Sequence, residues 1–118
     1  MASTVAIIDD SRVSRMMVAS IVKRVLPDCT IHEAANSEEA IELYGRESID
    51  KGIFDLNMPG RDGLELAEVL AGTGIDRSSM AILTVNVQGT VQGRIEAAEV
   101  TFVPKPPSED KLRAFLTA

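Results

Sequence analysis

The chain has 118 residues and a formal net charge of −6; hydrophobic residues make up 45% of it and charged residues 25%. These values are typical of one globular domain, so we predict a single domain over residues 1–118. The acidic balance argues against a nucleic-acid surface. No apolar run approaches the roughly 20 residues that span a bilayer, and no signal-peptide pattern opens the chain. The single Cys29 excludes an internal disulfide and favours a reducing, cytoplasmic compartment.

Apolar stretches alternate five times with segments of helical character. We expect strands at 4–8, 30–34, 50–55, 80–83 and 100–103, and helices at 11–26, 36–44, 64–72, 86–99 and from 108 onward. Strands that alternate with helices form parallel sheets with helices on both faces, so the predicted fold class is α/β.

The first helix has the clearest apolar periodicity. Its apolar residues recur every three or four positions, at Val13, Met16, Met17, Ile21, Val22 and Val25. Such an apolar stripe is typical of a helix that packs one face against the core. Pro27 cannot continue the helix and ends it.

Glycine and proline mark the weaker elements. Lys51 and Gly52 interrupt the third strand, which we therefore expect to be short and to begin near Ile53. Segment 86–99 contains two glycines that cost roughly 0.5–1 kcal/mol each inside a helix, so the fourth helix should be weak. Pro104 has no N–H to donate, so the fifth strand should lie at an edge of the sheet.

Four predicted strands end in polar side chains. These side chains are Asp9, Asp10, Asp55, Thr84 and Lys105. A Pro-Gly turn follows Asp55 within five residues, which indicates that Asp55 lies at the tip of its strand. The carboxyl ends of parallel strands share one edge of the sheet, and ligands bind there in open α/β folds. We therefore predict one site that brings these residues together.

This set of residues, with the sequence DLNMPGRDG from Asp55 to Gly63, resembles the receiver domain of two-component response regulators. The resemblance extends over essentially all 118 residues. It implies a flavodoxin-like, doubly wound sheet of five parallel strands in the order 2-1-3-4-5, with five helices. It also implies a signalling switch that catalyses its own phosphorylation and dephosphorylation, rather than an enzyme acting on free substrates.

The acidic residues predict a magnesium site. Carboxylates held together repel one another unless a cation lies among them, and Mg²⁺ prefers one or two carboxylates, waters and a phosphate oxygen. We expect Asp10 and Asp55 as direct ligands, with Asp9 acting largely through water. The resemblance adds the backbone carbonyl of Asn57. Without Asp55, capping of the first helix at Ser11 would be the preferred explanation of Asp9 and Asp10.

Asp55 is the expected phosphoacceptor, because a carboxylate can attack phosphorus and form an aspartyl phosphate. Lys105 would neutralise the transferring phosphoryl oxygens as a point charge, and Thr84 would donate its hydroxyl to one of them. The resemblance implies that a sensor histidine kinase or phosphotransfer protein is the donor. It further implies a cis Lys105–Pro106 bond and a switch formed by Thr84 and Phe102.

Three further residues are expected to tune access and rate. Val85 stands where receivers usually have Ala or Gly, and its bulk would narrow the mouth of the site. Asn57 and Asn86 lie two residues after Asp55 and Thr84, at positions that vary in the family and tune the lifetime of the phosphoryl group.

Two other functions stay open at this point. One is an Mg²⁺-dependent phosphatase with an Asp nucleophile, although such enzymes usually carry D-x-D on the first strand, and here that strand ends in Asp9-Asp10. The other is a receiver-like adaptor that works without phosphorylation. His32 is the only histidine, and its predicted edge-strand position argues against a phosphohistidine carrier. No effector segment follows Ala118, so we expect output through an unidentified partner protein, whether the chain stands alone or was cut from a longer regulator.

Overall fold

The computed structural model describes residues 3–85 and 88–118. Five strands form one parallel sheet: β1 (Thr4–Ile8), β2 (Thr30–Ala34), β3 (Lys51–Asp55), β4 (Met80–Thr84) and β5 (Thr101–Pro104). Their order is β2-β1-β3-β4-β5, and each neighbouring pair is parallel. The predicted flavodoxin-like order is confirmed, and so is the edge position of β5, where Pro104 does not interrupt a central ladder.

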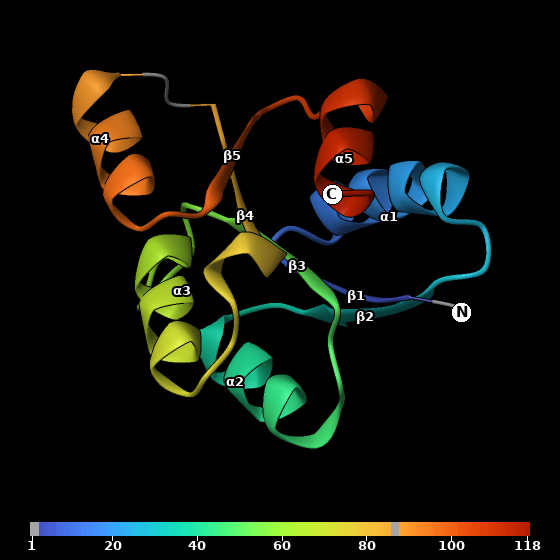
Figure 1. The fold of residues 1–118 in the computed structure, drawn as a ribbon, viewed down its shortest axis with the longest axis horizontal. Coiled ribbons are helices and arrows are strands. Elements are labelled where there is room, and N and C mark those ends of the chain that lie inside the picture. Colours follow the sequence, from blue (N-terminus) through green and yellow to red (C-terminus); the bar gives the residue numbers. More distant parts are fainter. Residues whose placement is uncertain (1–2, 86–87) are drawn as a thin grey trace.

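Helices cover both faces of the sheet, as Figure 1 shows. They are α1 (Arg12–Val25), α2 (Ser37–Arg46), α3 (Gly63–Gly72), α4 (Gly89–Ala97) and α5 (Glu109–Leu116), with a 3₁₀ turn η1 (Arg77–Ser79) before β4. Helices α1 and α5 pack together on one face, and α2, α3 and α4 lie on the other. None of the helices in the described part of the chain is long and apolar enough to cross a membrane.

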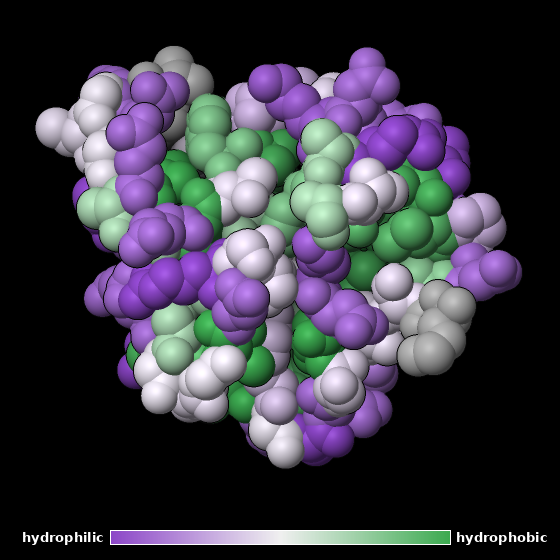
Figure 2. Space-filling model, viewed as in Figure 1, coloured by the Kyte–Doolittle hydropathy of each residue, from purple (hydrophilic) through white to green (hydrophobic). Residues whose placement is uncertain are grey.

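Successive strand residues enter two separate cores. Ile7 and Ile53 lie in the core under α1 and α5, whereas Ile8 and Phe54 lie in the core under α2, α3 and α4. Side chains alternate between the faces of a strand, so both faces need apolar residues when both are covered. This explains the unbroken apolar strands. In Figure 2, hydrophilic residues form much of the outer rim and hydrophobic ones show between the elements.

The third strand begins at Lys51, so the predicted start near Ile53 was wrong. Gly52 lies opposite Ala6 and Met80 in regular parallel ladders. A methyl group on Gly52 would collide with the hydroxyl of Tyr44 and the ring of Phe54. The glycine therefore makes room for α2 and does not end the strand.

The apolar stripe of α1 is only half buried. Ile21, Val22 and Val25 are buried as predicted, together with Val18. Val13, Met16 and Met17 are instead exposed, at 67%, 59% and 53% of their surface. These residues lie in the first turns after β1, near the carboxyl edge of the sheet, where the neighbouring elements do not cover them. The apolar periodicity of the helix therefore extends beyond the part that the core covers.

Helix α4 is the least anchored helix of the described chain. The side chain of its N-cap residue, Gln88, does not cap the first turn, and Ile95 is the one buried residue of the helix. This agrees with the expected weakness of the segment.

Candidate functional site

The predicted polar residues meet at the carboxyl edge of the sheet. Asp9 follows β1, Asp55 ends β3, Thr84 ends β4 and Lys105 follows β5. Asp9, Asp55 and Thr84 are buried, with 2%, 6% and 1% of their surface exposed, whereas Asp10 is exposed. Parallel pairing of β1, β3, β4 and β5 brings these strand ends together, because neighbouring strands end at matching heights.

Three carboxylates and one ammonium form the centre of the site. One oxygen from each of Asp9, Asp10 and Asp55 lies within 4.8 Å of the others. Lys105 Nζ lies 2.9 Å from Asp55 Oδ1 and 3.4 Å from Asp9 Oδ2. The cluster therefore keeps an excess of negative charge, and its donors are the hard oxygens that Mg²⁺ prefers. The residues present fit a divalent cation.

The environment shifts the pKa values of Asp55 and Lys105, the two members of the central ion pair. Burial raises the pKa of Asp55, and repulsion by Asp9 and Asp10 raises it further, against the hydrogen bond from Lys105. Burial by itself would lower the pKa of Lys105, but the hydrogen bond and charge of Asp55, with the charge of Asp9, raise it overall. Lys105 therefore stays protonated, while Asp55 is a carboxylate whose charge is only partly balanced by the protein.

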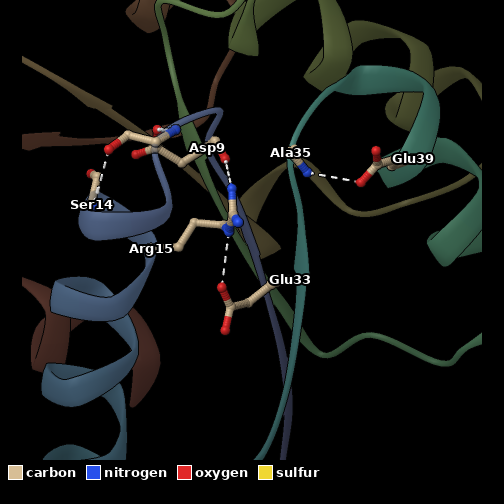
Figure 3. A network of polar contacts seen from close by, with 7 residues as sticks. Asp9, Ser14, Arg15, Glu33, Ala35 and Glu39 are labelled. Atoms are coloured by element: carbon tan, nitrogen blue, oxygen red, sulfur yellow. Dashed lines mark hydrogen bonds and ion pairs between the residues drawn. The ribbon is translucent and has the colours of Figure 1, made fainter.

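A second set of contacts holds Asp9 in place (Figure 3). Its N–H donates to the carbonyl of Ala34 at 3.1 Å, and its Oδ1 accepts from the N–H of Ser11 at 2.9 Å. Arg15 Nη1 donates to the Asp9 carbonyl at 2.6 Å, while its Nε donates to Glu33 Oε1 at 2.9 Å. Sequence reasoning missed Arg15 and Glu33, because 18 positions separate them and the pairing of β2 with β1 brings them together.

The other predicted residues that the structure describes lie at the end of β4, in β5 and in the loop after β3. The carbonyl of Thr84 accepts the N–H of Lys105 at 3.0 Å, which ties the ends of β4 and β5 together. Val85 is 67% exposed. Phe102 is half-buried against the core under α4. Asn57 is exposed, and Asn86 lies outside the described residues.

The loop after β5 completes the rim of the site. The Lys105–Pro106 peptide bond is cis, as the resemblance implied. A groove of about 350 Å³ runs beside it and is lined by residues of this loop, of α1 and by Val85. The site therefore opens onto the exposed apolar part of α1.

The other singled-out residues lie on outer elements. His32 is on the edge strand β2, with Nε2 3.7 Å from Glu47 Oε1. Cys29 is a buried free thiol in the core under α1. Neither residue belongs to the acidic cluster.

Curated response regulators are similar in sequence to this chain, over most of its length or over part of it. It is 26% identical over 113 residues to the cyclic di-GMP phosphodiesterase response regulator RpfG of Xanthomonas campestris, covering 93% of this chain and 30% of RpfG. It is 39% identical over 69 residues to the nitrate/nitrite response regulator NarL of Escherichia coli, covering 58% of this chain and 32% of NarL. The chain thus spans about a third of the length of these relatives.

Solved structures share the fold. The Vibrio cholerae chemotaxis protein CheY4 superposes with a TM-score of 0.86 at 23% identity, over 99% of this chain and 98% of CheY4. A putative response regulator from Chloroflexus aurantiacus gives a TM-score of 0.86 at 19% identity, over the full length of both chains. The family model of the response regulator receiver domain matches residues 5–117. This chain therefore belongs to the receiver domains of two-component response regulators.

Proposed function

We propose that this receiver accepts a phosphoryl group on Asp55, with Mg²⁺, from the phosphohistidine of a sensor kinase or phosphotransfer protein. The observation that carries the proposal is the position of Lys105 Nζ, 2.9 Å from Asp55 Oδ1, beside the carboxylates of Asp9 and Asp10. A nucleophile next to a fixed ammonium and a cation site is the arrangement that phosphoryl transfer requires.

The chemistry follows from the charges. A carboxylate oxygen of Asp55 attacks phosphorus while the bond from phosphorus to the donor histidine nitrogen breaks, and that nitrogen keeps the electron pair. Lys105 stabilises the negative charge on the phosphoryl oxygens. Asp10, Asp55 and the carbonyl of Asn57 would hold Mg²⁺, with Asp9 acting through water; the ion supplies further neutralisation of those oxygens. Hydrolysis by water then returns Asp55 to its carboxylate form.

Output depends on a shift between two states. The Thr84 hydroxyl moves toward the new phosphoryl group, and Phe102 on the edge strand β5 repacks. Support comes from the position of Thr84 at the end of β4 and from the half-buried state of Phe102, whose ring can change its packing without opening the central core. Phosphorylation then biases an equilibrium that exists without it, and a partner protein reads the α4–β5–α5 surface.

A protein donor, rather than only a small molecule, is supported by the surface beside the site. Val13, Met17 and Val85 are large, exposed and apolar. They line the same groove as Lys105 and Pro106, so a protein seated on them would bring a side chain to Asp55. Contiguous exposed apolar residues beside a reactive group are typical of a docking surface, and we assign this one to the phosphodonor protein.

Intact mass measurement tests the proposal. Acetyl phosphate with Mg²⁺ should add one phosphoryl group to the parent and none to Asp55→Asn, which keeps the shape and removes the nucleophile. Asp28→Asn, at an exposed aspartate outside the site, is the control and should gain the group as the parent does. An equal adduct on Asp55→Asn would contradict the assignment, and sustained turnover of phosphate esters would favour a phosphatase.

A further inference from the structure

We propose that Arg15 is a positioning residue for the cation site: its guanidinium holds the peptide group between Asp9 and Asp10 and thereby directs the Asp10 carboxylate toward Asp9 and Asp55. This inference rests on the cation binding of the proposed function.

The guanidinium lies between two partners from different elements (Figure 3). Arg15 Nη1 donates to the Asp9 carbonyl at 2.6 Å, and Nε donates to Glu33 Oε1 on β2 at 2.9 Å. The Arg15 side chain is only 16% exposed, so solvent competes little for these bonds. The arginine therefore joins α1 and β2 to the peptide group that follows Asp9.

That peptide group determines where Asp10 points. The N–H and side chain of Asp9 are already held by Ala34 and Ser11. The carbonyl of Asp9 belongs to the next peptide plane, and charge-assisted bonds such as the one from Arg15 are short and directional. Asp10 is exposed, so packing does little to fix its side chain, and its backbone sets its direction. Loss of the Arg15 bond would free the plane to rotate and spread the Asp10 carboxylate over several positions.

Glu33 makes this arrangement compatible with a cation. An unpaired guanidinium next to the cluster would repel Mg²⁺, but the Arg15–Glu33 pair carries no net charge. The pair supplies a strong donor without adding positive charge. Simple electrostatics and the positioning role therefore predict opposite results for removal of the arginine: the unpaired Glu33 carboxylate would add negative charge and tighten cation binding, whereas a disordered Asp10 would weaken it.

The test measures cation affinity directly. Free Mn²⁺ is followed by electron paramagnetic resonance at fixed ionic strength, with Mg²⁺ as competitor, for the parent, Arg15→Met and Arg24→Met. Arg24 is the control, because it lies on the same helix, further from the acidic residues, and its Nε also donates to a glutamate, Glu109 Oε1, at 2.9 Å. We expect about a tenfold loss of affinity for Arg15→Met, as is usual for residues that orient metal ligands. Arg24→Met should stay close to the parent.

Two further variants separate positioning from general stability. Arg15→Lys keeps the charge but cannot make both bonds, so its affinity should fall between those of the parent and Arg15→Met. Glu33→Gln keeps the Arg15 bond to Asp9 and leaves the guanidinium charge unbalanced. Its smaller loss should shrink as salt rises, because it arises from repulsion. If Arg15→Met does not fold, Arg15→Lys carries the test, and an affinity equal to the parent's would then overturn the positioning role.

Each outcome has one meaning. Weaker binding by Arg15→Met, with Arg24→Met unchanged, supports the positioning role. Unchanged or tighter binding by Arg15→Met overturns it while leaving the proposed function intact. A parent that binds no Mn²⁺ or Mg²⁺ overturns both.

Discussion

At the residue scale, Asp55 is a buried carboxylate whose charge the metal-free protein balances only in part. Burial and the neighbouring acids raise its pKa, so the ionised form is disfavoured in the folded state relative to the unfolded chain. Such a group lowers the free energy of unfolding above its unfolded pKa, and this cost is absent once the group is protonated.

Asp55→Asn should therefore raise the free energy of unfolding of the metal-free protein at neutral pH. The advantage over the parent should narrow as the pH falls through the pKa of Asp55, because the protonated acid resembles the amide. Urea unfolding of both proteins in a chelator, at several pH values, measures this. An advantage that grows on acidification would contradict the proposed cause.

Val85 is the residue at which we expect bulk to restrict access to Asp55. It is 67% exposed and lines the groove that contains Lys105. Val85→Ala removes two methyl groups but no polar group, so phosphorylation by acetyl phosphate and spontaneous dephosphorylation should both accelerate. The expected factor is about ten or less, equivalent to roughly 1.4 kcal/mol in the barrier. The measurements are the rate of phosphorylation by acetyl phosphate and the rate of spontaneous dephosphorylation of the parent and of Val85→Ala, with an unchanged Mg²⁺ affinity as the control. Equal dephosphorylation rates would mean that valine does not restrict access.

Tyr44 carries a buried hydroxyl that has no hydrogen-bond partner among the described residues. Burial raises its pKa, which reflects the same poorly solvated environment. Tyr44→Phe should raise the free energy of unfolding by up to about 1 kcal/mol, because it removes an unsatisfied polar group.

Gly52→Ala should destabilise the protein, because its methyl group would clash with the Tyr44 hydroxyl and with Phe54. Adding Tyr44→Phe to Gly52→Ala should recover part of that lost stability. Additive effects in the double variant would rule out the contact as the cause.

At the element scale, α1 combines two surfaces in one helix. Its second half packs into the core with Val18, Ile21 and Val22. Its first half leaves Val13 and Met17 exposed in the groove that contains Lys105. Exposed large apolar side chains cost solubility and are usually kept for binding. The helix therefore links the fold to the proposed docking of a donor protein.

Met17→Lys should slow phosphoryl transfer from a histidine phosphotransfer protein that phosphorylates the parent. A loss of about tenfold, near 1.4 kcal/mol, is typical of a central interface residue. Phosphorylation by acetyl phosphate should be unchanged, because the variant leaves Asp55 and Lys105 intact. Thr30→Lys, at the start of β2, adds the same charge away from the site and should have no effect. An equal slowing with both donors would mean that Met17 affects the chemistry and not the docking.

At the scale of the whole molecule, cation binding is coupled to folding, because the carboxylates come from the ends of two strands far apart in sequence: Asp9 and Asp10 follow β1, and Asp55 ends β3. A ligand that binds only the folded state stabilises it, by about 2.7 kcal/mol at one hundred times its dissociation constant. Mg²⁺ should therefore raise the melting temperature of the parent. The rise in melting temperature should be smaller for Asp10→Asn than for Asp9→Asn, since of these two residues only Asp10 is a proposed direct ligand. Thermal unfolding across a Mg²⁺ titration measures both; an equal or reversed order would count against these roles.

Much of the fold and of the site follows from the order of residues along the chain. Apolar strand segments followed by helical ones determine a parallel α/β sheet, and polar residues that end its strands must gather at one edge. Asp9, Asp10, Asp55, Thr84 and Lys105 could therefore be identified before any contact was known. The motif from Asp55 to Gly63 added the strand order through its resemblance to receivers, because periodicity alone carries no information on which strands are neighbours.

Tertiary structure decided what covers each element and which distant residues meet. Periodicity predicts Met17 and Ile21 on one face of α1. Met17 is nevertheless exposed, because the neighbouring elements cover only the part of that face that contains Ile21. Gly52 predicted a late start for β3, but the strand begins at Lys51, and the glycine leaves room for the Tyr44 hydroxyl of α2. The contact of Arg15 with Glu33 depends on the pairing of β1 with β2, and no local pattern encodes it. Local sequence determines the conformation and apolar faces of a segment, whereas exposure and long-range hydrogen bonds depend on how the whole chain packs.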